Sequence, residues 1–375
     1  MTRTIIDVHV LQTVPPSNLN RDDTGSPKTA VYGGARRARV SSQAWKRATR
    51  SDFADLLDAS ELGTRTKRVV ELLGDRIMTA RPGTSEEDAQ AAAAEVLNSA
   101  DIKLKDSRKK GAPQESGYLL FLSAQQIAAL ASLAVESLDG GSKPDKKKAQ
   151  ALVKDKNSID LALFGRMVAD VTDLNVDAAC QVAHALSTHA VQTEYDYFTA
   201  VDDHKAADDE EDAGAGMIGT VEFTSATLYR YATVDVDLLA GNLGDPVATE
   251  RAVDAFLRAF VTSMPTGKQN TFANRTLPDA VVISVREDQS VSYVGAFEDP
   301  VPAAAEGGRV RTSAERLAEY ARDVADAFGA RAVQTWVVGI PAVAALEELG
   351  GKVSFDDAVS GATRLVAERV GALAS

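Results

Sequence analysis

The sequence predicts an α+β fold in which a helical segment is inserted into a core of strands and helices. Residues 4–11 are β-branched and apolar at successive positions, which is typical of a buried strand. Residues 65–155 are rich in Ala, Leu, Glu and Lys and contain few strand signals. From residue 221 onward, strand patterns alternate with amphipathic helices. At about 150 residues per domain, the length suggests two domains.

The first half of the chain predicts one strand, one loop and a series of helices. Residues 14–34 hold several Pro and Gly residues and are expected to form a long loop, a length that is often functional. A helix is expected from Ser41 or Ser42 to about residue 57, because Ser is a good N-cap and good helix formers follow it. The insertion is expected to form helices at residues 65–80, 85–98, 123–138 and 145–155.

The second half is expected to complete the core. Residues 176–189 fit either a helix or an extended segment, and the acidic, Ala- and Gly-rich stretch at 206–219 is expected to be mobile. Strands are expected at residues 221–223, 227–234, 279–285, 290–297 and 331–338. Helices are expected at residues 246–263, 312–329 and 355–372.

Composition excludes several classes of protein. Hydrophobic residues make up 45% of the chain and charged residues 25%, which excludes a disordered chain, a collagen and a coiled-coil rod. No window holds about 18 uncharged apolar residues, so no transmembrane helix is expected. Asp7 comes too early for a secretory signal. The single Cys180 excludes an internal disulfide and a multi-cysteine metal site, and fits a reducing cytoplasm.

The net charge of −13 hides an uneven distribution. Residues 15–50 carry eight Lys and Arg against two acids, whereas residues 202–212 carry seven acids against one Lys. Electrostatic binding depends on local patches rather than on the sum, so a polyanion remains a possible partner of the first segment.

The basic segment has the residue types of a phosphate-binding surface. Lys46 and Arg50 are four residues apart and share a helix face. The helix start presents unpaired N–H groups, to which Ser41, Ser42 and Gln43 add neutral donors. A solvated basic edge with a helix cap is the alternative. Asp22 and Asp23 in the loop can hold a divalent ion near a scissile phosphate, or they can cap a turn or pair with Arg21, which we favour.

Two further segments suit nucleic acid. The aromatic run at residues 195–198 and Met167 can stack on bases or, as isolated observations, pack in the core. Residues 266–273 combine a Gly, a cation, amides and hydroxyls that can contact phosphate and sugar, but they lack the spacing of a Walker loop. The alternative is an ordinary helix-to-strand connection. His184 and His189 do not have the spacing of a helical zinc pair, and no metal or cofactor is expected.

Together these segments resemble a known family. The run from His9 to Ala48 is similar to the backbone subunit of the type I-E CRISPR surveillance complex, Cascade, which is the CasC family of the Cas-seven superfamily. Four more blocks match in order: DLALFGRM (160–167), CQVAHALSTHAVQTEYDYFTAVDD (180–203), GTVEFTSATLYRYA (219–232) and GKQNTFA (267–273). Five ordered blocks over about the first 300 residues make the match specific.

The resemblance implies a right-hand architecture. It consists of a ferredoxin-like palm that resembles an RNA-recognition motif, a helical fingers insertion and a thumb hairpin. The implied boundaries are palm at 1–59, fingers at 60–155, palm or web at 156–195, thumb at 196–224 and palm again at 225–375.

The resemblance also implies a function. Copies of the chain would polymerise along one CRISPR RNA without cutting it, and would present the spacer for pairing with target DNA. Partners would be further copies, the large and small subunits and the guide-end caps. The residues expected to contact RNA are Asn20, Arg21, Lys28, Ser41, Ser42, Gln43, Lys46, Arg47, Arg50, Arg166, Met167, Tyr197, Phe198, Thr199, Lys268, Gln269 and Asn270. The alternative is a metal-dependent ribonuclease that cuts guide-paired target RNA through Asp22 or Asp23.

Overall fold

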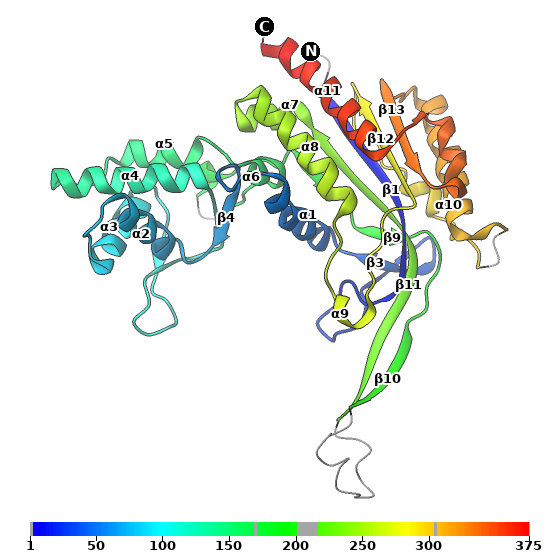
Figure 1. The fold of residues 1–375 in the computed structure, drawn as a ribbon, viewed down its shortest axis with the longest axis horizontal. Coiled ribbons are helices and arrows are strands. Elements are labelled where there is room, and N and C mark those ends of the chain that lie inside the picture. The colour runs from blue at the N-terminus through cyan, green and yellow to red at the C-terminus, as the bar shows by residue number, and fades with distance from the viewer. Residues whose placement is uncertain (1–2, 169–170, 201–216, 304–305, 375) are drawn as a thin grey trace, which may run out of the picture.

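The computed structural model describes residues 3–168, 171–200, 217–303 and 306–374, which form a mixed α+β fold around one large sheet. A helical lobe lies to one side of the sheet, and a long hairpin extends away from its lower end (Figure 1). The two chain ends lie close together at the opposite end of the sheet (Figure 1). None of the helices in the described ranges is long and apolar enough to cross a membrane.

The sheet is built around β1 (Ile5–Ser17), which pairs antiparallel with β11 (Met217–Asp235) and with β12 (Ala280–Arg286). The predicted strand at 4–11 is confirmed, but it continues to Ser17 with an irregular register around Pro15 and Pro16. In spatial order, the main path of the sheet is β14 (Gly351–Lys352), β13 (Gln334–Gly339), β12, β1, β11, β9 (Ala185–Ser187), β3 (Ala35–Val40) and β2 (Thr29–Tyr32). Two further strands pair with β11, namely β8 (Cys180–Val182) and β10 (Glu194–Ala200).

Helices cover both faces of the sheet. One face packs its apolar side chains against a set of helices that share one core, which are α1 (Ser42–Leu56), α6 (Ile159–Phe164), α7 (Val236–Leu243), α8 (Pro246–Thr262) and α11 (Phe355–Ala374). The other face packs against α10 (Gly308–Phe328) and the 3₁₀ segments at Val294–Phe297 and Pro341–Glu348. The short α9 (Gln269–Phe272) lies beyond the end of α8.

The helical lobe has an apolar core of its own. Its helices are α2 (Val69–Ala80), α3 (Glu86–Ser99), α4 (Ala124–Gly140) and α5 (Lys146–Lys154). The four predicted helices are therefore confirmed, except that the first begins at Val69 and not at residue 65. The sequence prediction missed two small sheets in this region. They pair β4 (Gly63–Thr66) with β7 (Leu120–Ser123), and β5 (Leu104–Lys105) with β6 (Glu115–Ser116). Short 3₁₀ turns lie before and after the lobe helices in the sequence, at Ala59–Glu61 and Thr172–Leu174.

Several element predictions need correction. Residues 14–34 are not one loop, because β1 runs to residue 17 and β2 begins at residue 29. Residues 176–189 are extended where they are regular, and the two strands predicted at 221–234 are one continuous strand. Residues 294–297 form a 3₁₀ turn instead of a strand. The stretch at 206–219, predicted to be mobile, lies mostly outside the described residues.

Candidate nucleic-acid interface

Helix α1 begins where the sequence predicts. Ser41 is its N-cap, and the Ser41 hydroxyl accepts a hydrogen bond from the Ala44 N–H at 3.3 Å. Trp45, Thr49 and Phe53 recur every four residues and are buried, so they fix which side of the helix faces the core. Gln43 and Arg47 are exposed on the outer side of the helix, and Ser42 and Lys46 are half-buried beside the core-facing side.

A buried arginine holds α1 on the sheet. The Arg230 guanidinium lies 3.7 Å from the Trp45 ring centre and 4.7 Å from that of Phe260, and it donates to Gln12 Oε1 at 2.6 Å. Burial lowers the pKa of Arg230 to about 9, so the side chain stays charged at neutral pH. This contact joins α1, β11 and α8, and it gives the exposed face of α1 a fixed position.

The loop at residues 18–28 is bonded directly to the start of α1. Asn20 Oδ1 accepts from the Ser41 N–H at 2.8 Å, and the Asn20 carbonyl accepts from the Lys28 N–H at 2.9 Å. Asn18 donates to the carbonyl of Glu222 in β11 at 3.0 Å. The loop therefore presents Arg21 and Lys28 beside the helix end from an ordered backbone.

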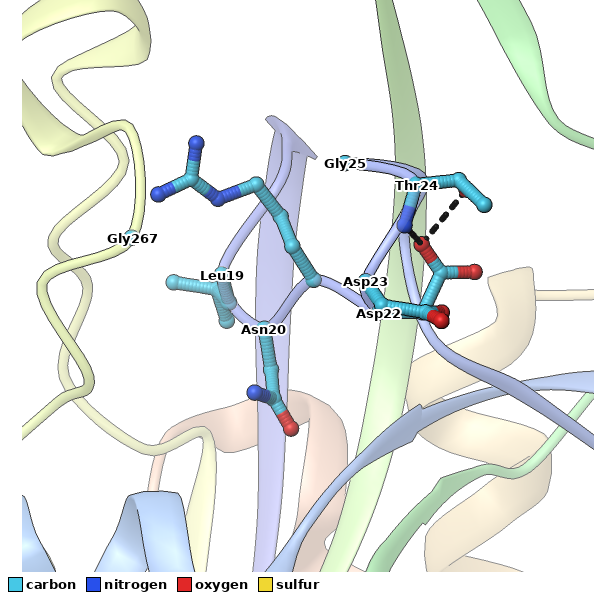
Figure 2. Close-up of a pocket in the computed structure, with 8 residues that line it drawn as sticks. Leu19, Asn20, Asp22, Asp23, Thr24, Gly25 and Gly267 are labelled. Carbon is cyan, nitrogen blue, oxygen red and sulfur yellow. Dashed lines mark hydrogen bonds between the residues drawn. The ribbon is translucent and has the colours of Figure 1, made fainter.

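The segment at residues 266–273 closes against the same loop. A Cβ on Gly267 would lie 2.2 Å from the Leu19 carbonyl oxygen, so only glycine permits this approach. Leu19, Asn20 and the following loop residues to Gly25 line a shallow pocket together with Gly267 (Figure 2). Phe272 packs on Phe223 of β11 with ring centres 5.8 Å apart. Two of the three sequence-predicted segments thus form one surface, which we call the basic strip: residues 18–28, the exposed face of α1 and residues 266–270.

A cluster of cations adjoins the basic strip. Arg39 Nη1 lies 3.1 Å from His184 Nδ1, and the Arg39 N–H donates to the Lys28 carbonyl at 2.9 Å. Partial burial and then the charges of Arg39 and Lys28 lower the pKa of His184 below its ordinary value. The sequence prediction did not include Arg39 or His184, because their proximity depends on pairing of β3 with β9.

Asp22 acts as a turn cap. Its Oδ1 accepts from the Thr24 hydroxyl at 2.7 Å and from the Thr24 N–H at 3.0 Å (Figure 2). It also accepts from the Ser26 N–H at 3.0 Å. The bond from the Thr24 hydroxyl is the main cause of the lowered pKa of Asp22. Asp23 is exposed next to it. Among the described residues, no group of three or more His, Cys, Asp or Glu side chains is placed to hold a metal ion.

The hairpin of β10 and β11 carries the predicted stacking residues. Tyr197 pairs with Thr220 and Phe198 with Gly219, so the two aromatic side chains point to opposite faces of the hairpin. Tyr197 is 63% exposed, whereas Phe198 is 37% exposed and lies over Gly219. Thr199 follows on the Tyr197 face and is exposed. Tyr195 shares that face and is 67% exposed, and the period of two along a strand is the signal that identifies it.

Comparisons with known proteins decide the family. The family described as CT1975-like protein matches residues 6–360. The chain belongs to this family. A solved chain described as "CRISPR RNA-guided surveillance complex, pre-nicking" is 35% identical, with a TM-score of 0.85 over 96% of this chain and 100% of that chain. A second, described as "CRISPR RNA-guided surveillance complex", is 30% identical, with a TM-score of 0.76 over 96% and 99%. A comparison with curated proteins gave no match.

The predicted relation of this CT1975-like protein to CasC-type backbone subunits is therefore confirmed. Two of the residues predicted to contact RNA have hydrogen-bond partners inside the protein. Arg50 bonds to the buried Asp160 carboxylate at 2.8 Å and to the Gly63 carbonyl at 3.0 Å. Arg166 is 5% exposed and donates to three backbone carbonyls. Both guanidinium groups are engaged within the protein, because partners distant in the sequence surround them.

The other predicted residues lie in three places. Lys46 Nζ lies 5.9 Å from the centre of the Phe164 ring, which brings the basic strip toward the end of α6. Met167, shortly after α6, is 85% exposed. In Figure 1, α6 and β10 lie far apart, so within one molecule Met167 and the aromatic residues of β10 are separate. Lys268, Gln269 and Asn270 remain half-buried or exposed at the edge of the basic strip.

Proposed function

We propose that this CT1975-like chain is the guide-RNA-binding backbone subunit of a type I-E Cascade complex. Copies of it polymerise along one CRISPR RNA and present the spacer for pairing with target DNA. The observation that carries the proposal is the basic strip, in which two segments about 240 residues apart in the sequence meet at the start of α1. The full-length likeness to chains of RNA-guided surveillance complexes supports it.

The donors of the basic strip suit a carrier that must accept any spacer. Arg21, Lys28, Lys46, Arg47 and Lys268 supply charge, and Gln43, Gln269 and Asn270 supply neutral hydrogen bonds. Contacts to phosphate and sugar position a nucleic acid without reading its sequence. They leave Watson–Crick edges free for pairing, as guide-dependent recognition requires.

The right-hand organisation forms part of the proposal. The fingers are residues 60–155, and the separate apolar core of the helical lobe, to which Val168 and Leu174 also belong, supports a distinct unit there. The thumb is residues 196–224, which include most of the β10–β11 hairpin. The palm is residues 1–59 and 225–375, with 156–195 as palm or web. Each thumb contacts a neighbouring copy in a head-to-tail arrangement, which forms a filament because the contact does not close.

The subunit is proposed to hold RNA without cutting it, and to work in the cytoplasm with the large, small and guide-end subunits of the complex. The engagement of Asp22 in its own turn supports this role. The test is to incubate the assembled complex with Mg²⁺ and RNA complementary to the guide. Intact RNA is expected for the wild type and for Asp23→Ala. Regular cuts that disappear in Asp23→Ala would establish the ribonuclease instead.

The decisive experiment for the proposal is co-expression with the companion subunits, with and without a CRISPR array. We expect a large particle that contains one RNA of uniform guide length, and that does not form without the array. Mass, the ratio of absorbance at 260 and 280 nm and the extracted RNA measure this. A monomer free of nucleic acid under both conditions would overturn the proposal.

A further inference from the structure

Met167 is an exposed apolar side chain between two buried neighbours. Met167 is 85% exposed, whereas Arg166 is 5% exposed and Val168 is 1% exposed. An exposed methionine on a surface loop normally has many rotamers and a mobile backbone. Here the backbone on both sides of the side chain is fixed, so the exposure of Met167 does not follow from local disorder.

Arg166 is the main anchor. Its Nε donates to the Leu174 carbonyl at 2.6 Å, Nη1 to the Phe121 carbonyl at 3.0 Å and Nη2 to the Val153 carbonyl at 3.0 Å. These acceptors belong to a 3₁₀ turn, to β7 and to α5, so one side chain joins three elements of the helical lobe. The planar guanidinium can satisfy three separated carbonyls at once, which a lysine ammonium cannot do in the same geometry.

Backbone contacts complete the anchor. The Arg166 N–H donates to the Val176 carbonyl at 3.0 Å, and the Val176 N–H donates to the Arg166 carbonyl at 2.9 Å. The Val168 N–H donates to Asn175 Oδ1 at 2.6 Å. Gly165 has a φ of +75°, and a Cβ there would lie 2.8 Å from the Val176 carbonyl oxygen. The segment from Gly165 to Val168 is therefore held along its length.

We propose that Arg166 is a positioning residue: it holds Met167, which the family resemblance implies contacts RNA, in the orientation that lets this side chain insert beside a base. The proposal rests on the proposed function. The proposal gives Arg166 no phosphate contact, because its side chain is buried and all three of its nitrogen atoms donate to backbone carbonyls. Because the backbone around Met167 is ordered before RNA binds, it loses no conformational freedom when the side chain inserts. This preorganisation favours displacement of the base.

The experiment assembles the complex on guide RNAs that carry 2-aminopurine at one position, moved through the spacer one nucleotide at a time. A displaced base gives high emission. We expect Arg166→Lys to bind RNA within about threefold of the wild type with an unchanged salt dependence, because no phosphate contact is lost. At the guide positions where the wild-type complex gives high emission, we expect the emission of Arg166→Lys to fall to the level of Met167→Ala. The emission of the Arg166→Lys/Met167→Ala double variant should be no lower than that of Met167→Ala alone, because both changes remove the same inserted side chain.

The controls separate positioning from general stability. Arg286→Lys changes an equally buried arginine, which pairs with Asp7 on the other side of the sheet, and it should keep the full emission. If Arg166→Lys does not fold, Asn175→Ala removes the bond to the Val168 N–H and should give the same loss of emission. Full emission in Arg166→Lys and Asn175→Ala, or an Arg166→Lys/Met167→Ala double variant well below Met167→Ala, would overturn this inference but not the proposed function. A wild-type chain that takes up no RNA would overturn the proposed function, and this inference with it.

Discussion

The basic strip and the β10–β11 hairpin are both exposed, but they differ in charge and in chemistry. The strip combines cations with hydroxyl and amide donors on a backbone that is bonded to α1. The hairpin residues 194–200 and 217–223 include three acids, Glu194, Asp196 and Glu222, and no Lys or Arg. Among the hairpin side chains that the structure describes, the large exposed apolar ones are aromatic, with Tyr195 and Tyr197 on one face and Phe198 on the other.

This difference indicates a division of labour. A surface without cations gains nothing from the phosphate charges, whereas aromatic rings can stack on any base. In the proposed filament, the phosphate charges would therefore be neutralised by the basic strip and not by the described residues of the hairpin. The strip would hold the backbone of the guide, and the hairpin would act on bases.

The largest expected effect comes from Gly267→Ala, which separates the two halves of the strip. The new Cβ would overlap the Leu19 carbonyl, a backbone atom that cannot rotate away. We expect a loss of about 1–3 kcal/mol in unfolding free energy, as for overpacked cores. We expect RNA affinity to fall about 100-fold, because residues 268–270 and the loop can no longer share a ligand. Thermal melting and filter binding measure the two effects.

The matched control is Gly241→Ala in α7, where an added Cβ meets nothing within 4 Å. It should leave RNA binding unchanged and favour the helix slightly, because alanine has the higher helix propensity. Equal RNA affinity in the Gly267 and Gly241 variants would show that residues 266–270 are not part of the strip.

The second effect tests charge on α1. Lys46→Ala with Arg47→Ala should weaken RNA binding about 30-fold, or about 1 kcal/mol for each lost hydrogen bond at an exposed site. The slope of log affinity against log salt should become shallower by about 1.4, because single strands lose about 0.7 per phosphate contact. The loss should be the same for all spacers. A loss confined to some spacers would mean that α1 reads bases.

The control for this prediction is Arg331→Ala with Lys352→Ala. Both are exposed cations paired with nearby acids. Arg331 lies shortly before β13 and Lys352 lies in β14, so both are remote in sequence from the basic strip. They change the net charge by the same amount, so they correct for long-range electrostatics. Binding and salt slope should remain those of the wild type.

The third effect tests the hairpin. Tyr197→Ala should lower affinity about tenfold, within the 1–3 kcal/mol expected for one stacked base, and should not change the salt slope. Phe198→Ala should keep the fold but lower the fraction of guide bases that are displaced, as measured by 2-aminopurine emission. It should also lower the melting temperature slightly more than Tyr197→Ala, because Phe198 covers Gly219. A shallower salt slope in either variant would contradict the division between hairpin and strip.

The sequence could predict the strip where local signals determine the structure. The Ser41 cap and the spacing of Trp45, Thr49 and Phe53 lie within one helix, so they define both its start and its outer face. The five ordered motifs predicted the family, and through it the aromatic hairpin. Pro15 and Pro16 wrongly indicated the end of the first strand, since β1 accommodates them with an irregular register against β11.

The roles of Arg50 and Arg166 could not be predicted from the same signals. Asp160 is 110 residues from Arg50, and the acceptors of Arg166 come from three elements of the lobe. The sequence around a basic residue looks the same whether its side chain binds phosphate or backbone carbonyls. Only the tertiary contacts distinguish the two. For the same reason, Arg39 and His184 were not predicted to adjoin the strip.

The smallest expected effect is a pH dependence that belongs to the strip and not to the hairpin. The pKa of His184 lies below its ordinary value of 6.5, so the ring of the free protein is neutral at pH 7. A phosphate beside Lys28 would favour the imidazolium and raise this pKa in the complex. RNA binding then takes up a proton, and affinity rises as the pH falls. We expect about a threefold gain between pH 7.5 and 5.5. His184→Gln should abolish it, Tyr197→Ala should retain it, and an equal gain in His184→Gln would show that the cluster of Lys28, Arg39 and His184 does not meet the RNA.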